Sequence, residues 1–329
     1  MTNTNSPVNS QLPGTTLVSL RDIRDAASAI KEHVHRTYQQ GSTYLNDVSG
    51  TNVSLKLELF QKTGSFKVRG VINTLRQLSE IDRKRGVISL SAGNHAQALA
   101  WGAAKLGIEA TIVMPMTAVA SKVAATKGYG GIVVQTDGDL LSTAMALKEE
   151  RGLALVHPFD DLRVIAGQGT VGLELVEDVP DVDVVIVACG GGGLLSGVAA
   201  AVKQLKPKVR VIGVEPEGAN SMKRSLEAGS PQRLAKLNTV ADGLAAPFAG
   251  ANTFEHVKHY VDELLVISDA EILAGMRVLM ERCKLFAEPS AGAAIAPLLS
   301  GTTVFAKGER VVPIVCGGNI DLERLRTLL

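Results

Sequence analysis

One lysine stands at a position in the chain where a primary amine could do chemistry. Residues 53–60 alternate apolar and polar side chains, as a half-buried strand does. After Gly64 the apolar spacing becomes helical, so we expect a helix with Ser65 as its N-cap and Lys67 in its first turn. A helix N-terminus carries positive partial charge and disfavours a cation. Lys67 is therefore either a surface lysine in water or an amine that works in its neutral form.

Four consecutive glycines follow an apolar segment: Gly190, Gly191, Gly192 and Gly193. The segment, residues 184–188, is rich in valine and isoleucine without alternation, which is typical of a parallel strand buried on both faces. Consecutive glycines at a helix start let backbone N–H groups converge on an anion. The run matches neither the dinucleotide fingerprint nor the Walker sequence. We interpret it as a phosphate-binding loop, with a tight strand-to-helix turn as the alternative.

Two further polar stretches follow predicted strand ends, where open α/β sheets bind ligands. Ser91-Ala92-Gly93-Asn94-His95 combines a hydroxyl, an amide, an imidazole and free backbone N–H groups, which would suit a carboxylate. A plain serine N-cap is the alternative for this stretch. Cys316-Gly317-Gly318-Asn319 has the same placement after the last core strand. A cysteine in such a place is otherwise a buried small hydrophobe.

Composition limits the class of protein. A chain of 329 residues with 46% hydrophobic and 4% aromatic residues suits two domains of an α/β fold. The net charge of +1 offers no field for nucleic acid. The first fourteen residues are polar and lack the pattern of a signal peptide, and the longest apolar stretch is interrupted by glycines, so we expect no membrane span. The three cysteines lack metal-ligand spacing and point to a reducing cytoplasm.

The elements that must position these residues form two βα series. The first has strands at 87–90, 110–114, 132–135 and 153–156, with helices at 94–105, 118–127 and 139–150. The second has strands at 184–188, 209–214, 264–267 and 311–315. Capping boxes open helices at Ser19 and Ser268, the first helix covering 19–38. We therefore expect two open, twisted, mostly parallel sheets with flanking helices: a small domain at 77–159 and a large domain from 1–76 and 160–329.

Taken together, the motifs resemble a known family. Six of them occur in the same order as in pyridoxal-phosphate enzymes of fold type II (tryptophan synthase β-like), and within these the sequence is most similar to the serine/threonine dehydratase and serine racemase family. The resemblance covers the chain past about residue 15 and rests on Ser65-Phe66-Lys67-Val68-Arg69-Gly70, Ser91 to His95, Ala166-Gly167-Gln168-Gly169-Thr170, the glycine run, Glu288-Pro289-Ser290-Ala291-Gly292 and Cys316 to Asn319.

The resemblance implies a cofactor, pyridoxal 5'-phosphate, and a role for each matching residue. Lys67 would hold the cofactor as a Schiff base and later act as a general base, which removes the conflict with the helix dipole. Gly190 to Gly193 would hold the phosphate. The remaining roles would fall to Phe66 against the ring, Asn94 at the ring hydroxyl, Cys316 at the pyridine nitrogen, and Ser91, Asn94 and His95 at the substrate carboxylate.

The resemblance also implies an activity. We expect an ammonia-lyase that converts L-threonine or L-serine to 2-oxobutanoate or pyruvate and ammonia by β-elimination. A serine racemase, or a dehydratase of 3-hydroxyaspartate or phenylserine, is the first alternative, and a non-catalytic phosphate-ligand binding protein is a remote one. Racemases of this family carry a second serine as the opposite-face acid/base where this chain has Ala92. This difference favours the lyase.

Two further expectations follow from the resemblance. The family's divalent-metal site would use Glu215 and the carbonyl of Ala219, but its third ligand, an aspartate, is Ser221 here, which puts the metal in doubt. The chain is expected to form a homodimer or homotetramer and to bind a small β-hydroxy amino acid, without nucleic-acid or membrane partners.

Overall fold

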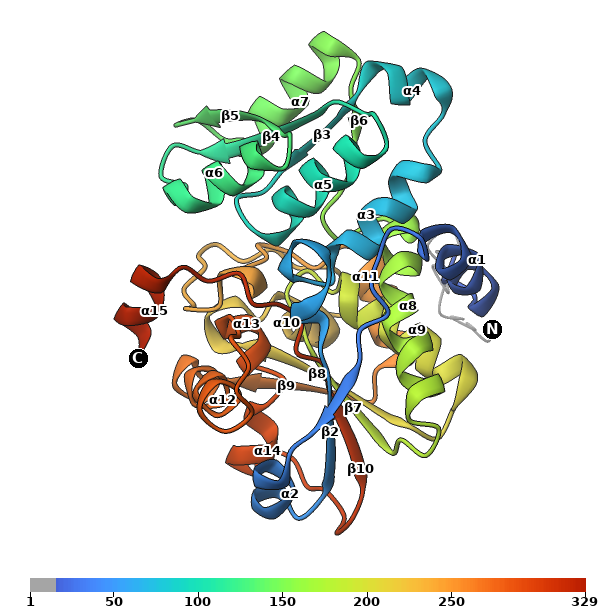
Figure 1. Cartoon of the computed structure of the whole chain (residues 1–329), viewed down its shortest axis with the longest axis vertical. Coiled ribbons are helices and arrows are strands. Elements are labelled where there is room, and N and C mark those ends of the chain that lie inside the picture. The colour runs from blue at the N-terminus through green and yellow to red at the C-terminus, as the bar shows by residue number, and fades with distance from the viewer. Residues whose placement is uncertain (1–15) are drawn as a thin grey trace, which may run out of the picture.

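The computed structural model describes residues 16–329, and the polar first fourteen residues, for which no signal peptide is expected, lie outside them. Two sheets, each covered by helices, are stacked along the long axis of the molecule (Figure 1). The upper unit in that view contains β3 to β6, and the lower unit contains the larger sheet. This arrangement confirms the predicted α/β class with two mostly parallel sheets.

The larger sheet has six strands in the order β1-β2-β10-β7-β8-β9. Only the β1–β2 pair is antiparallel within it, and the other four pairs are parallel. The register places Val311 opposite both Val53 and Val184. The strands are β1 (Gln39–Gly41), β2 (Asn52–Lys56), β7 (Val184–Ala188), β8 (Arg210–Pro216), β9 (Glu263–Ile267) and β10 (Arg310–Pro313).

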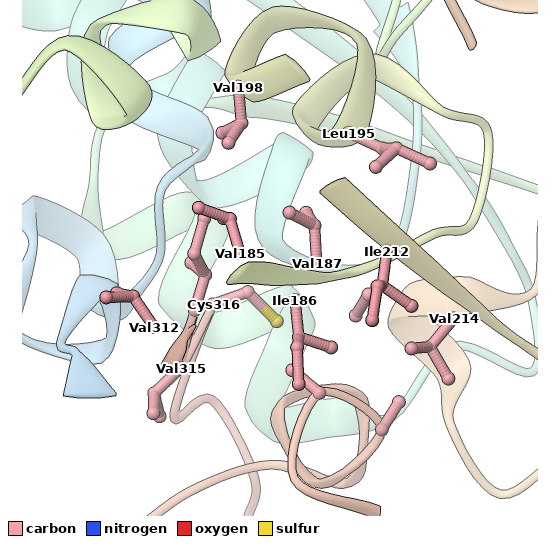
Figure 2. Close-up of a cluster of buried hydrophobic side chains, with 14 of the residues drawn as sticks. Val185, Ile186, Val187, Leu195, Val198, Ile212, Val214, Val312, Val315 and Cys316 are labelled. Atoms are coloured by element: carbon pink, nitrogen blue, oxygen red, sulfur yellow. The ribbon is translucent and has the colours of Figure 1, made fainter. Parts of the chain in front are cut away.

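Valine and isoleucine side chains fill both faces of this sheet. Figure 2 shows Val185 and Val187 on the face toward Val198 of the following helix, with Ile186 on the other face. All five residues of β7 are buried, as the unbroken apolar run predicts. The sheet is flanked by α1 (Leu20–Ile30), α2 (Thr43–Ser49), α8 (Leu162–Asp178), α9 (Gly193–Leu205), α10 (Ser221–Ala228), α11 (Ala251–Tyr260), α12 (Asp269–Glu281), α13 (Pro289–Gly292) and α14 (Ala296–Ser300), and α15 (Leu322–Leu328) ends the chain.

The smaller sheet has four parallel strands in the order β5-β4-β3-β6. Its members match the predicted βα series within a few residues. They are β3 (Val87–Leu90), β4 (Ala110–Pro115), β5 (Ile132–Thr136) and β6 (Ala154–Leu155), with α4 (Glu80–Arg85), α5 (Asn94–Lys105), α6 (Ala120–Gly128) and α7 (Leu140–Arg151).

Two of the predicted helix caps are present in the structure, and a third is not. Ser19 and Ser268 form the predicted capping boxes with Asp22 and Glu271. The first helix ends at Ile30, eight residues earlier than the predicted end at residue 38. Ser65 is not an N-cap: its backbone is extended, and it pairs with Gly317 in an antiparallel bridge. The predicted strand 53–60 likewise stops at Lys56, and residues 58–60 form a 3-10 turn. The reason is that the side chain of Glu58 is buried, where it pairs with the guanidinium of Arg69.

Helix α3 (Lys67–Arg76) lies between the two units (Figure 1). Val68, Val71, Ile72 and Leu75 belong to one apolar cluster with α5 and the small sheet. On another side of the helix, the backbone of Gly70 packs against α8 at Gly167. The helix that carries the candidate lysine is therefore held by both units.

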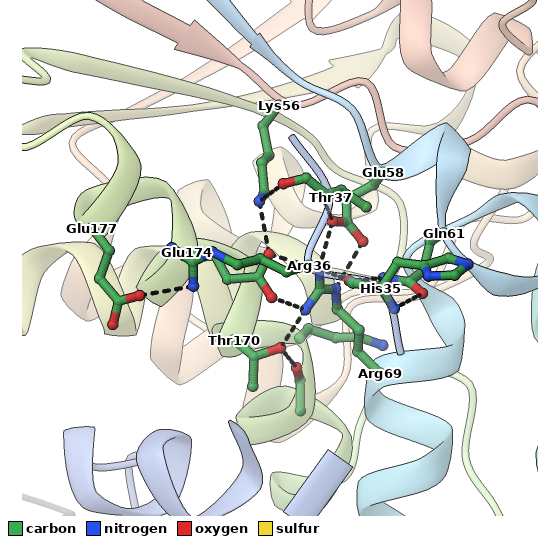
Figure 3. A network of polar contacts seen from close by, with 12 residues as sticks. His35, Arg36, Thr37, Lys56, Glu58, Gln61, Arg69, Thr170, Glu174 and Glu177 are labelled. Atoms are coloured by element: carbon green, nitrogen blue, oxygen red, sulfur yellow. Dashed lines mark hydrogen bonds and ion pairs between the residues drawn. The ribbon is translucent and has the colours of Figure 1, made fainter. Parts of the chain in front are cut away.

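A buried ion network fixes the start of α3 (Figure 3). The guanidinium of Arg69 donates to both carboxylate oxygens of Glu58 at 2.8 Å, and to both of Glu174 at 2.7 and 2.9 Å. It also donates to Thr170 Oγ1. Lys56 Nζ donates to Glu174 at 2.7 Å. These contacts raise the pKa of Arg69, despite burial, and lower that of Glu58, so the charges compensate each other in the interior.

Within residues 16–329, no helix is both long enough and apolar enough to span a bilayer.

Candidate active site

The order of the large sheet brings three sequence-distant segments to one edge. Strands β2, β10 and β7 are neighbours, and parallel strands present their carboxyl ends at the same edge. Lys67 follows β2, Cys316 follows β10, and the glycine run follows β7. The N–H of Phe66 donates to the carbonyl of Cys316 at 3.2 Å, which fixes the residue before the lysine against the end of β10.

The side chain of Lys67 lies at the carboxyl ends of these strands and is held by one hydrogen bond. Its Nζ donates to the carbonyl oxygen of Pro158 at 2.8 Å and lies 5.2 Å from the centre of the Phe66 ring. Burial lowers the pKa of Lys67 to about 8, although Cys316 and Glu288 act in the opposite direction. An amine with this pKa has a substantial neutral fraction at mildly alkaline pH, and the neutral form is the nucleophile that attacks an aldehyde.

The glycine run forms a tight loop without room for side chains. A Cβ at Gly191 would overlap the ring of Phe159, and one at Gly193 would lie 3.0 Å from the Cβ of Phe159. Gly192 has φ +89°, which favours glycine. Within the described chain, no side chain caps the start of α9 at Gly193. Its first-turn N–H groups are therefore available for an anion, and Pro158 and Phe159 link this loop to Lys67.

Asn94 connects the two units across the site. It opens α5, and its Nδ2 donates to Glu288 Oε1 at 2.8 Å. Its Oδ1 accepts a hydrogen bond from Asn319 Nδ2 at 2.8 Å, and the same Asn319 nitrogen donates to the carbonyl of Thr63 at 2.7 Å. Asn94 is thus brought to the edge that holds Lys67, with its amide bonded on both sides.

Glu288 is a residue of this site to which the sequence analysis gave no role. Its side chain is 7% exposed, and burial raises its pKa to about 7, while the hydrogen bond from Asn94 opposes that shift. The motif Glu288-Pro289-Ser290 could have indicated this role. An acid that stands between a buried alanine and a proline that starts a helix is drawn into the interior, where its carboxylate needs a polar partner. The partner, Asn94, is 194 residues away in sequence.

Ser91 and His95 behave differently. Ser91 is half-buried after β3, and its Oγ accepts the N–H of Gly93 at 3.2 Å, which leaves the hydroxyl proton for a ligand. The His95 ring is buried, with Nε2 at 3.0 Å from Ser89 Oγ and 3.2 Å from the carbonyl of Val156. Burial lowers its pKa to about 3, so the ring is neutral. The neutral, inward-facing imidazole offers no charge to a carboxylate, whereas the backbone N–H of His95 lies in the first turn of α5.

Cys316 is a buried thiol at the end of β10. Its side chain is 3% exposed, and burial together with the nearby Glu288 carboxyl raises the pKa of Cys316 well above its usual value. The thiol stays neutral over the physiological range. A neutral weak donor at this position does not supply the negative charge that would hold a protonated pyridine nitrogen.

These residues fit pyridoxal phosphate. The lysine has the pKa of a nucleophile, and the cradle at Gly190 to Gly193 has open N–H groups for a phosphate. Beside Lys67, the hydroxyl of Ser65 is fully buried and has no hydrogen-bond partner among the described residues, as expected where a polar ligand belongs. Lys67 would hold the aldehyde carbon, the glycine loop the phosphate, Phe66 and Asn94 the ring, and Cys316 would face the ring nitrogen.

The expected metal ligands do not fit a divalent cation. Both carboxylate oxygens of Glu215 already accept backbone N–H groups, from Met222 at 2.9 Å and Lys223 at 2.8 Å. Burial raises the pKa of Glu215 to about 8, which disfavours its charged form near neutral pH. Ser221 replaces the third ligand, and residues 16–329 contain no cluster of three or more acidic, histidine or cysteine side chains that could hold a metal. The carboxylate instead caps the start of α10.

Comparison with known proteins supports this assignment of the cofactor. The family model described as "Pyridoxal-phosphate dependent enzyme" matches residues 30–317. An L-threonine ammonia-lyase of Thermotoga maritima is 44% identical over 95% of this chain and 78% of its own. A catabolic L-threonine dehydratase of Staphylococcus aureus is 43% identical over 94% of this chain and 91% of its own.

Solved structures give the same result. Maize serine racemase superimposes with a TM-score of 0.91 at 38% identity, covering 95% of this chain and 97% of its own. The processed form of threonine deaminase isoform 2 from Solanum lycopersicum superimposes with a TM-score of 0.88 at 32% identity, covering 98% of each chain. With Lys67 and the glycine loop at one sheet edge and a family model that spans most of its length, this chain belongs to the family of pyridoxal-phosphate dependent enzymes.

Proposed function

We propose that the protein is a pyridoxal-phosphate dependent ammonia-lyase that converts L-threonine or L-serine to a 2-keto acid and ammonia. The main support for this proposal is that one amine base, Lys67, lies beside the proposed carboxylate site, and that the residue after Ser91 in that site is Ala92, which cannot act as a second base. The names of the two sequence relatives support the substrate class. The bound cofactor would supply an electron sink for the bond between the substrate Cα and its proton.

The protein's own residues would orient the substrate and move its proton. The hydroxyl of Ser91 and the first-turn N–H groups of α5 would bind the substrate carboxylate, since they carry no side-chain cap among the described residues. Lys67 Nζ, once free of the cofactor, would take the Cα proton as general base, at the mildly alkaline pH where its amine is neutral. The neutral thiol of Cys316 would favour prompt loss of the β-hydroxyl over a long-lived carbanion.

Racemisation is the second candidate, because maize serine racemase is a close structural neighbour. A racemase needs a second acid/base on the opposite face of Cα. The family resemblance places that group at residue 92, which is alanine here and half-buried in the loop after β3. An alanine cannot deliver a proton, so we favour elimination.

We expect keto acid from L-threonine and L-serine, with little D-isomer. The test is a keto-acid assay over L-threonine, L-serine, D-serine, 3-hydroxyaspartate and phenylserine, followed by chiral chromatography of the L-serine left after partial turnover. D-serine that accumulates as fast as pyruvate would contradict the lyase proposal. Turnover of 3-hydroxyaspartate or phenylserine well above that of L-threonine would replace the substrate.

We also propose that residues 77–159 form a mobile small domain that closes over the substrate. Polar contacts across the boundary would hold the closed arrangement. Asn94 bonds to Glu288 and Asn319, and Lys122 of α6 forms an ion pair with Asp242 at 3.1 Å. Arg324 of α15 lies 3.9 Å from the same Asp242 carboxylate. The ion pair lies at the surface and would favour the closed arrangement without locking it.

Removal of the Lys122 charge is expected to raise KM for L-threonine by up to about fivefold with little change in kcat, since an exposed pair contributes roughly 0.2–1 kcal/mol. Steady-state kinetics of Lys122→Ala would measure this. Lys127→Ala on the same helix is the matched control, because no ion pair is found for Lys127 among the described residues. An equal KM in both variants would argue against the closure contact.

The three cysteines are buried and unpaired in the described chain, which supports a reducing compartment such as the cytoplasm.

We further propose a homodimer or homotetramer, for which the exposed, stacked Tyr38 and Phe60 beside the edge strand β1 offer apolar surface.

A further inference from the structure

The carboxyl of Glu288 faces charged and polar groups from every element packed against it. Its negative charge is close enough to Lys67 of α3 and to the thiol of Cys316 to raise the pKa of both. Lys122 of α6 attracts its negative charge and Asp242 repels it. A Cβ on Gly317 would lie only 2.5 Å from Glu288 Oε1, so the glycine leaves the space that the carboxyl occupies.

The direction of each hydrogen bond in this cluster is fixed by one backbone carbonyl. The oxygen of Thr63 can only accept, so the atom of Asn319 that contacts it is the amide nitrogen. The same nitrogen contacts Asn94, which must present its Oδ1 there. Asn94 Nδ2 is therefore the atom that faces Glu288, and Glu288 Oε1 accepts.

This polarity matters for what Asn94 can offer a ligand. An asparagine NH₂ group has two hydrogens, and one of them is used by Glu288. The second hydrogen is left for the cofactor side of the amide. Asn94 would therefore offer a donor to the ring oxygen of bound pyridoxal phosphate, which suits a negatively charged oxygen.

We propose that Glu288 is a positioning residue that holds the amide of Asn94 as a donor toward the cofactor ring and supplies Lys67 with a titratable negative charge. The proposal rests on cofactor binding at Lys67 and does not depend on which amino acid the enzyme converts. It goes beyond the assignment of Asn94 alone, because the acid sets both the orientation of the amide and the local electrostatics.

The charge of Glu288 changes near neutral pH. Its pKa, raised to about 7 by burial, means that the carboxyl is neutral below that pH and ionised above it. A negative charge favours the protonated form of a nearby nitrogen, so ionised Glu288 raises the proton affinity at Lys67 Nζ. The nitrogen that links Lys67 to the cofactor should therefore keep its proton to higher pH when Glu288 is present.

The test is a pH titration of the visible absorption band of the holoenzyme, without substrate, in the wild type and in Glu288→Gln. Glutamine keeps the acceptor oxygen and the shape but removes the charge. We expect the two spectra to agree below about pH 6 and to diverge above about pH 7, with the alkaline midpoint of the variant lower by about one unit. Glu263→Gln is the matched control. Glu263 is half-buried and accepts one hydrogen bond, from Thr303. It is the first residue of β9, so it lies away from the carboxyl ends of the strands, where Lys67 is held. This variant should titrate as the wild type does.

An unchanged midpoint, or a difference of constant size at every pH, would overturn the electrostatic role, since a merely structural defect does not follow the ionisation of one group. Should Glu288→Gln fail to fold, Glu288→Ala tests the same claim, because it also removes the charge and must lower the alkaline midpoint. A wild-type protein with no visible band would refute cofactor binding at Lys67 instead, so the two failures are distinguishable.

Discussion

Replacement of Lys67 by alanine is expected to lower kcat for L-threonine by about 10²–10⁴-fold, the contribution of a positioned general base. The variant loses both the amine that holds the cofactor and the base that takes the Cα proton. The half-buried side chain has one protein hydrogen bond, to the carbonyl of Pro158, so its loss should change the free energy of unfolding by only about 1 kcal/mol. Keto-acid formation and thermal unfolding measure the two quantities.

Lys62→Ala is the control for this experiment. Lys62 lies five residues earlier in a 3-10 turn, and its side chain has no described contact with the site residues. It should leave both turnover and the visible absorption band unchanged. Turnover of Lys67→Ala close to that of the wild type would show that another amine holds the cofactor.

The Arg69→Met variant is expected to lower the free energy of unfolding by about 3–5 kcal/mol, the usual cost of breaking a buried ion pair from one side. Methionine fills part of the volume but leaves the carboxylate of Glu58 without the guanidinium that neutralises it, while Glu174 keeps Lys56 alone. Glu58 is fully buried, so its charge cannot recover hydration. Urea unfolding at neutral pH measures the loss.

Arg36→Met is the matched control, because Arg36 pairs with Glu177 and Asp178 while half of its side chain stays in water. A solvent-exposed pair contributes about 0–1 kcal/mol. If both variants lost the same free energy of unfolding, the buried network would contribute no more to stability than a surface ion pair. A stable Arg69→Met protein would show that the acids become protonated at little cost.

Much of this protein could be predicted from local patterns. The unbroken apolar run at 184–188 predicted a buried parallel strand, and the structure has one with the same bounds. The capping boxes at Ser19 and Ser268 formed as predicted, because a cap needs only residues within one turn. The motifs around Lys67, Asn94 and the glycine run identified the family, since six of them in one order are specific.

Other features depend on partners that no local pattern specifies. Ser65 looked like an N-cap, but its backbone pairs with Gly317, which lies more than 250 residues later. His95 looked like a ligand for a carboxylate, but its ring is turned inward to Ser89 and Val156. Both side chains are polar enough for either role, and the neighbouring strand decides between them.

The sequence by itself therefore determined most of the elements and the family, and it predicts Lys67 as the reactive amine, because periodicity, capping and motif order act over short stretches of chain. The tertiary structure decided the buried acids. Glu288 meets Asn94, and Glu58 meets Arg69, only because the order of strands in the large sheet and the placement of α3 and α5 bring them together. A buried charge needs a partner in space, and the sequence states the need without stating which partner satisfies it.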